Sequence, residues 1–199
     1  MGEAPGDRPI LPHDVWPRFH HMGPKANNVP ATRPMAEPEP EPEPPVLLDP
    51  DVEVPAGIAT ERFELRPLGP EHNAADHEAW SSSIDHIRAT PGFGPAHSWP
   101  VEGMDLDQNR RDLEMHRRHF DERRGFTYTV LDAEDSDRVL GCVYLYADPT
   151  GDHPVEVRSW VSARVADLDA ELRRTVAAWL RSSWPFESFR YAGLDPDGR

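Results

Sequence analysis

Residues 155–180, VEVRSWVSARVADLDAELRRTVAAWL, decide the fold, because they read as a strand, a short turn and an amphipathic helix. In residues 155–161 the valines alternate with a glutamate, an arginine and a tryptophan, which is the period-2 pattern of a strand with two different faces. From Leu168 onward the apolar residues recur every three or four positions, as on one side of a helix. A strand that runs directly into a helix places the helix N-terminus at the edge of a sheet, where α/β proteins tend to bind phosphates.

Two aspartates stand at the expected start of this helix. Asp167 is the predicted N-cap, and Asp169 in the first turn suits the positive end of the helix dipole. Asp169 also precedes Arg173 by four residues, which is the spacing of an ion pair on a helix surface. We expect the helix to end before Pro185.

Length, charge and cysteine content restrict the class of protein. The 199 residues suffice for one core of ordinary size and a tail. A net charge of −15 argues against nucleic acid and anionic membrane surfaces as partners.

The longest apolar run, residues 139–147, is about half as long as a membrane helix, and no signal pattern opens the chain. The only cysteine, Cys142, lies in this run and is expected to be a buried core thiol. We therefore expect a soluble cytoplasmic protein.

Residues 1–55 differ in composition from the rest, since they hold 14 of the 23 prolines and few apolar residues. The block EPEPEPEPP at residues 37–45 predicts an extended, polyproline-like rod. We expect a disordered tail over residues 1–55 and a folded domain over residues 56–199. The tail is either a solvated segment or a docking arm for a proline-binding groove. Translation could also begin at Met22 or Met35.

The remaining pattern predicts six further elements. They are a strand from Phe63 that stops at Pro67, a helix at 70–88 with a weak point at the serines 81–83, a helix at 105–124, strands at 126–131 and 138–147 joined as an antiparallel hairpin, and a short strand at 188–192. The order β-α-α-β-β-β-α-β is that of an α/β domain with a mixed sheet. The helix between strands 155–161 and 188–192 allows a crossover, so these two strands are expected to be parallel neighbours.

The helix at 105–124 has the clearest end signals. Asp105 followed by Gln108 resembles a capping box, and Gly125 stands where a C′ glycine is expected. Its expected buried side carries Leu106, Leu113 and Phe120.

Asp112, His116 and His119 fall on one face of this helix at a spacing compatible with a metal ion. Because no fourth ligand or cysteine accompanies them, a solvated helix face is the favoured interpretation and no metal site is expected.

Aromatic residues mark a loop dense in glycine and proline, PGFGPAHSWP at residues 91–100. Phe93 and Trp99 could line a substrate pocket or fold back as a lid on the core, and the sequence leaves both open. Trp80 could share that pocket, although core packing is the more common role of a helical tryptophan.

Two segments resemble known motifs. TERFELRPL at residues 60–68 resembles TERLxLRPL, and VEVRSWV at residues 155–161 resembles EIGYWV. These are the first and fourth strands of the GCN5-related N-acetyltransferase (GNAT) superfamily, especially its ribosomal-protein and small-amine N-acetyltransferases. The resemblance covers residues 60–192. It implies transfer of an acetyl group from acetyl-CoA to a primary amine of a small molecule or a peptide.

The resemblance also implies a coenzyme site. In this superfamily the end of the fourth strand binds the pantetheine arm, and a following turn, [QR]xxGx[GA], binds the pyrophosphate. When these motif positions are transferred to this chain, the resemblance implies that the coenzyme contacts are Val161, Arg164, Ala166, Asp167 and Asp169. Arg164 matches the first position of the turn. Asp167 and Asp169 replace small residues, and their carboxylates would repel a pyrophosphate and obstruct the backbone N–H groups.

Glu156 is the candidate general base on the fourth strand. The alternative interpretation is that it faces solvent and has no catalytic role. Trp80, Phe93 and Trp99 are the candidate acceptor contacts. The superfamily continues past the fifth strand with a helix and two strands, which are missing here together with a tyrosine that often acts as general acid. A second copy of the chain could cover the exposed edge. The alternative to an enzyme is a degenerate GNAT-like module used in protein interaction or regulation.

Overall fold

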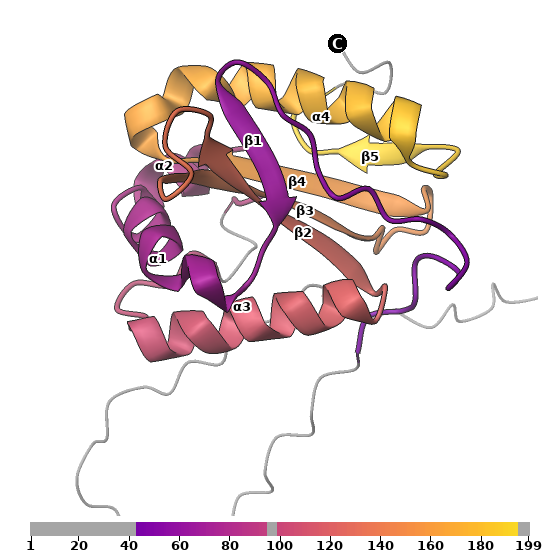
Figure 1. Ribbon diagram of the computed structural model, residues 1–199, viewed down its shortest axis with the longest axis horizontal. Coiled ribbons are helices and arrows are strands. Elements are labelled where there is room, and N and C mark those ends of the chain that lie inside the picture. The colour runs from indigo at the N-terminus through magenta and orange to yellow at the C-terminus, as the bar shows by residue number, and fades with distance from the viewer. Residues whose placement is uncertain (1–42, 95–98, 195–199) are drawn as a thin grey trace, which may run out of the picture.

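Five strands form a single mixed sheet in the order β1-β2-β3-β4-β5, within residues 43–94 and 99–194, which the computed structural model describes (Figure 1). Neighbouring strands from β1 to β4 are antiparallel, whereas β5 is parallel to β4. The strands are β1 (Phe63–Pro67), β2 (Gly125–Asp132), β3 (Val139–Ala147), β4 (Val155–Val161) and β5 (Phe189–Tyr191). The mixed sheet, the hairpin and the parallel neighbours are thus confirmed.

Helices cover both faces of the sheet. They are η1 (Pro70–His72), α1 (Asn73–Ser81), α2 (Ile84–Ala89), α3 (Leu106–Asp121), η2 (Ala163–Leu168) and α4 (Asp169–Ser183). The helix predicted at 70–88 is broken at the serines. Ser82 Oγ bonds back to the carbonyl of Glu78 at 2.8 Å, and Ser83 adopts non-helical dihedral angles before α2. Serine side chains compete for backbone groups in this way, which explains the break.

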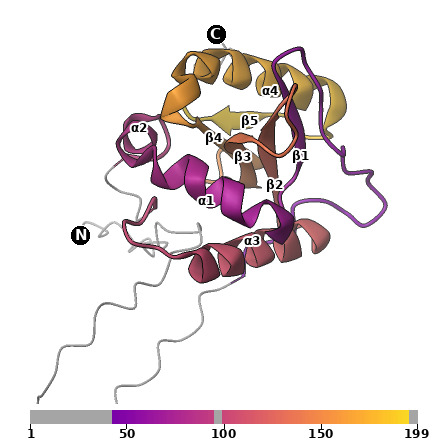
Figure 2. The same ribbon diagram turned by 60° about the vertical axis from the view of Figure 1, so that its left-hand side comes forward.

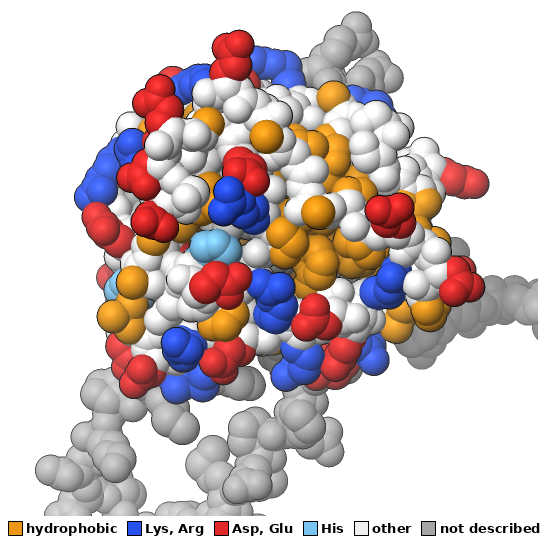
Figure 3. Space-filling model, in the orientation of Figure 1, with side chains coloured by type: hydrophobic (Ala, Val, Ile, Leu, Met, Phe, Trp, Pro, Cys, Tyr) orange, Lys and Arg blue, Asp and Glu red, His pale blue; other side chains and the backbone are white. Residues whose placement is uncertain are grey.

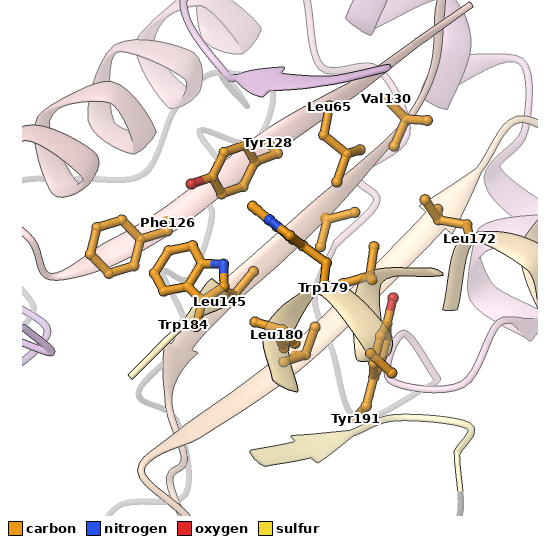
Figure 4. Close-up of a cluster of buried hydrophobic side chains, with 14 of the residues drawn as sticks. Leu65, Phe126, Tyr128, Val130, Leu145, Leu172, Trp179, Leu180, Trp184 and Tyr191 are labelled. Atoms are coloured by element: carbon orange, nitrogen blue, oxygen red, sulfur yellow. The ribbon is translucent and has the colours of Figure 1, made fainter. Parts of the chain in front are cut away.

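The two faces carry separate hydrophobic cores. On one face α4 packs its apolar side over β2 to β5, and Trp179 and Trp184 meet the rings of Tyr128 and Phe126 at centroid distances of 5.2 and 5.0 Å (Figure 4). On the other face α1, α2 and α3 cover Cys142, Tyr144 and Trp160 of the sheet. Cys142 is completely buried, as predicted.

Helix α3 begins as predicted but ends differently. Asp105 and Gln108 form the capping box, with bonds of 2.8 and 2.9 Å. At the other end Arg123 takes the left-handed conformation with φ of 60°, so the prediction of Gly125 as C′ residue is wrong. Gly125 is needed in β2 instead, because a Cβ there would lie 2.2 Å from the ring of Tyr146. Leu106 is 47% exposed, which also corrects its predicted burial.

Residues 43–58, which we call the strap, cross the sheet beside β1. Figure 3 shows hydrophobic side chains gathered on this face, where the strap passes in Figure 1. Leu48 is buried in the α4-side core, and Val52, Val54 and Ile58 pack against that core. Thus residues 43–55, which composition places in the tail, lie against the domain. Residues 1–42, including Met22 and Met35, lie outside the described part of the chain.

Hydrogen bonds to backbone groups of the strap hold it in place. Arg123 donates from Nη1 to the carbonyls of Asp49 and Val52 at 2.9 and 2.6 Å, and its own carbonyl accepts from the N–H of Leu47 at 2.8 Å. Farther along, the hydroxyl of Tyr128 donates to the carbonyl of Pro55 at 2.6 Å. The backbone polar groups of the strap thereby gain partners that a solvated tail would find in water.

We expect Leu48→Ala to lower the free energy of unfolding by about 2 kcal/mol, because it removes a buried leucine side chain from the main core. Val46→Ala is the matched control, since Val46 is 58% exposed two residues away and should change stability by less than about 0.5 kcal/mol. Urea denaturation of the full chain measures both. Equal effects of the two substitutions would show that the strap is not part of the core.

Within the described residues no helix is long and apolar enough to cross a membrane.

Candidate active site

The ladder between β4 and β5 is short. It pairs Val155–Val157 with Phe189–Tyr191, and a last bond joins the N–H of Ala192 to the carbonyl of Val157 at 3.1 Å. The chain then turns at Gly193, which has φ of 86°. Because β4 continues to Val161, its last residues extend beyond the ladder with β5.

The backbone alternation of β4 determines which groups face this open edge. The carbonyl of Val157 points to β5, whereas the N–H of Ser162 points to β3 and donates to Leu140 at 2.7 Å. Since successive residues of a strand point to opposite neighbours, the backbone groups of Ser159 and Val161 face the open edge. Val161 thus lies where the sequence predicted a coenzyme contact, and this role stays a prediction.

The turn that follows β4 is the 3₁₀ helix η2. Its first residues are held by Ser162, whose hydroxyl accepts from the N–H of Arg164 at 3.4 Å. Arg164 and Ala166 are exposed on this turn. The guanidinium of Arg164 pairs with Glu78 of α1 at 3.1 Å in a solvent-exposed ion pair, which contributes little energy and can exchange for another anion.

Asp167 does not cap helix α4, so this prediction is wrong. The N-cap is Leu168, whose side chain cannot bond an N–H group, and the N–H of Asp169 donates to the carbonyl of Ala166 in the preceding η2. The carboxylate of Asp167 instead pairs with Arg62, just before β1, at 2.7 Å. That bond is the main reason why the pKa of Asp167 is lowered. The first turn of α4 therefore lacks the side-chain obstruction that the sequence predicted at this position.

Asp169 is held differently. Its carboxylate is 3.4 Å from Nη1 of Arg173, which confirms the predicted pair within the helix. It also lies 3.3 Å from Nε2 of His86 on α2. Burial raises the pKa of Asp169, and the nearby Arg173 and His86 oppose that shift.

Glu156 is buried rather than solvent-facing. Its Oε2 lies 2.7 Å from Nη2 of Arg158, and its Oε1 lies 2.8 Å from Nη2 of Arg190 on β5. Arg190 in turn reaches the fully buried carboxylate of Asp148 at 2.8 Å. Both oxygens of Glu156 are thus engaged by guanidinium groups, and to accept a proton it must exchange one of these bonds.

The three predicted acceptor residues converge on one aromatic cluster. Trp99 lies at its centre, with ring centroids 6.0 Å from Trp80, 5.7 Å from Phe93 and 5.7 Å from Trp160 of β4. Trp80 and Phe93 are buried in the core that contains Trp160. Of the loop at 91–100, residues 95–98 lie outside the described residues.

Sequence reasoning missed a buried polar group beneath α1 and α3. Asp76 is buried, accepting from Nδ2 of Asn109 at 3.0 Å and from the thiol of Cys142 at 3.5 Å. Burial raises its pKa to about 6. On α3 the pKa of Asp112 is raised to about 7, mainly by burial and partly by the charge of Asp76. Nothing in the residue spacing indicated that these carboxylates would meet.

The neighbouring histidines correct the prediction of a solvated face on α3. His116 and His119 are both buried, and each Nδ1 lies within hydrogen-bond distance of the hydroxyl of Tyr146, at 2.8 and 3.1 Å. Burial lowers the pKa of His116 to about 3. The described residues contain no group of three or more potential ligands that could hold a metal ion.

The raised pKa of Asp112 predicts that the stability of the protein depends on pH. Folding raises its pKa from about 3.9 to about 7, so its contribution to stability is complete below pH 4 and is lost as the pH rises through 7. Asp112→Asn should therefore become more stable relative to the parent chain between pH 5 and 8, by about 2–3 kcal/mol or about 5–10 °C in melting temperature. The control Asp107→Asn, exposed on the same helix, should show a constant difference. A constant difference for Asp112→Asn as well would contradict the prediction.

Comparison with known proteins identifies the fold. No family model matches the chain, and no curated protein matches it. Among solved structures, the ribosomal-protein-S5-alanine acetyltransferase of Vibrio fischeri is 9% identical, with a TM-score of 0.51 over 68% of this chain and 72% of that one. A protein of Vibrio cholerae assigned as a ribosomal-protein-serine acetyltransferase is 14% identical, with a TM-score of 0.50 over 75% of this chain and 78% of that one. The chain therefore has the fold of the GCN5-related N-acetyltransferases, as its first and fourth strands predicted.

Proposed function

We propose that this chain transfers an acetyl group from acetyl-CoA to a primary amine. The observation that supports this best is the end of the β4–β5 ladder at Val157. Beyond it, the backbone groups of Ser159 and Val161 point away from β3, past the end of the ladder, and can bond an amide-containing chain such as pantetheine. The turn η2 follows at once and leads directly into α4, and the positive end of this helix dipole suits a pyrophosphate.

The charges around this turn are compatible with an anion. Arg164 is exposed there, with its side chain 63% accessible. The carboxylates of Asp167 and Asp169 are each paired with an arginine, Arg62 and Arg173, so their repulsion of a pyrophosphate is partly offset. The departure from the glycine-rich turn is thus less severe than the sequence indicated.

In the proposed reaction the amine attacks the thioester carbonyl, the carbon–sulfur bond breaks, and the thiolate of CoA leaves. The N–H of Val161 polarises the carbonyl oxygen. Glu156 receives the proton of the amine after exchanging its bond to Arg190, whose side chain is 41% exposed and can move. Trp99, which is half-buried, forms the apolar side of the acceptor region, and Trp80 and Phe93 are buried behind it in the core. The acceptor is a small-molecule or peptide amine.

Binding of acetyl-CoA tests the proposal. Ligand at 100 times its dissociation constant should stabilise the chain by about 2.7 kcal/mol, which is about 5–10 °C in melting temperature. Arg164→Ala should reduce this shift, whereas Arg174→Ala, exposed on α4, is the matched control and should not. A complete absence of a shift in the parent chain would contradict the proposed function and favour a non-catalytic module.

A further inference from the structure

Residues 83–93, which we call the α2 segment, contact both the end of β4 and the residues after β5, beyond the last pair of their ladder, in a region that we call the gap. The first contact is at the end of β4. Ser83 Oγ lies 3.1 Å from Ser162 Oγ and accepts from the N–H of Ala163 at 3.0 Å. Ser83 and Ser162 are both buried, so these bonds are shielded from water.

The middle of the α2 segment touches the start of α4. His86 Nε2 lies 3.3 Å from Oδ2 of Asp169, the first residue of that helix. Figures 1 and 2 both show α2 beside the N-terminal end of α4. The helix end proposed to receive the pyrophosphate therefore lies next to α2.

The far end of the α2 segment contacts the residues that follow β5. Gly92 has φ of 93°, and a Cβ there would lie 2.8 Å from Cβ of Ala192 and 3.2 Å from Cγ of Arg158. Likewise, a Cβ on Gly193 would lie 3.0 Å from Pro91. Only glycine allows both approaches, so the chain is packed tightly against the end of β5.

These contacts join the two sides of the gap. Ala163 and Asp169 belong to the β4 side, whereas Ala192 and Gly193 belong to the β5 side. We propose that the α2 segment is a gate that closes the coenzyme cleft in the free protein and swings outward when acetyl-CoA binds. This proposal rests on the proposed function, because it assumes that acetyl-CoA occupies the gap.

The construction of the segment suits such a movement. Helix α2 has six residues, the break at Ser82–Ser83 precedes it, and Gly92 follows it in a conformation that favours glycine. Ile87 is completely buried in the α1-side core and holds the gate closed in the absence of ligand. The apparent affinity for acetyl-CoA is then the intrinsic affinity reduced by the fraction of open molecules.

Weakening the closed state should raise the affinity. We expect Ser83→Ala/His86→Ala to bind acetyl-CoA about tenfold more tightly than the parent chain in calorimetric titration, because its contacts to Ser162, Ala163 and Asp169 are lost. The matched control is Ser182→Ala, since that hydroxyl bonds only to Trp179 and Ser183 at the C-terminal end of α4, and the affinity of this variant should be unchanged.

A disulfide provides the opposite test. Ser83→Cys/Ser162→Cys places two sulfur atoms where the oxygens are 3.1 Å apart, close enough for a disulfide with a small shift. The only native cysteine, Cys142, is completely buried and should not interfere. The oxidised protein should lose binding of acetyl-CoA by at least 100-fold, and reduction should restore it.

The outcomes separate the two proposals. If the oxidised and reduced forms bind acetyl-CoA equally, the gate is wrong and the proposed function stands. If the parent chain, the alanine variant and the reduced form all fail to bind, both proposals are wrong. Tighter binding by the alanine variant together with loss in the oxidised form supports the gate.

Discussion

Glu156→Ala should lower the free energy of unfolding by about 3–5 kcal/mol. The Glu156 side chain is 3% exposed and forms ion pairs of 2.7 and 2.8 Å with Arg158 and Arg190. Its removal leaves two guanidinium groups without their shared carboxylate, and the side chain of Arg158 is only 7% exposed. Burial already lowers the pKa of Arg158, which shows that its charge depends on compensation. Urea denaturation at neutral pH measures the loss.

Glu64→Ala is the matched control for this prediction. Glu64 also lies on a strand and pairs with an arginine, Arg66, at 2.8 Å, but its side chain is 35% exposed. A surface pair of this kind is worth less than about 1 kcal/mol. If both substitutions cost the same, the buried charge network does not stabilise the sheet.

The same network affects how activity should be tested. Loss of activity in Glu156→Ala would be ambiguous, because the variant is expected to be destabilised. Glu156→Gln keeps the size of the side chain and one acceptor oxygen but also removes the charge, so urea denaturation must first show that the variant is folded under the assay conditions. If Glu156 accepts the proton of the amine, this variant should bind acetyl-CoA normally, lose most of kcat and lose the acidic limb of the pH profile. A purely structural role would leave the pH profile unchanged.

Gly141→Ala should cost about 3 kcal/mol and weaken the binding of acetyl-CoA. A Cβ at position 141 would lie 2.0 Å from the carbonyl oxygen of Trp160 and 2.9 Å from Cα of Val161. Both atoms belong to the backbone, so no side-chain rotation can relieve the clash. Strands β3 and β4 must separate where β4 ends, and the backbone of Val161 moves with them.

Gly94→Ala controls for the general effect of replacing glycine. No atom lies within 4 Å of a Cβ at position 94, and its φ is outside the left-handed region. Its melting temperature and its acetyl-CoA affinity should match those of the parent chain. If Gly141→Ala also leaves both quantities unchanged, the close approach of β3 and β4 is not required for stability or binding.

Local patterns were sufficient to predict most of the elements. The alternation at residues 155–161 predicted β4 with its two faces, and the helical spacing that follows predicted α4. Asp105 and Gln108 located the start of α3, because a capping box involves groups only three residues apart. Serine chemistry likewise predicted the weak point between α1 and α2.

Contacts between distant segments were not predictable in the same way. Asp167 has the residue type and position of an N-cap, yet it pairs with Arg62, which is 105 residues away. His116 and His119 lie on the face of α3 that was predicted from the sequence to be solvated, yet they are buried against Tyr146 of β3. In each case the partner comes from another element that the spacing along one helix cannot reveal.

The amino-acid sequence by itself determined the strands, the helices and their order, because these depend on side-chain periodicity and on capping groups only a few residues apart. Only the tertiary structure decided that Glu156 is buried between two arginines, that residues 43–58 lie against the sheet, and that the α2 segment bridges the ends of β4 and β5. The physical reason is that burial and charge compensation depend on which segments the fold brings together in space, and this is not encoded in the spacing of neighbouring residues.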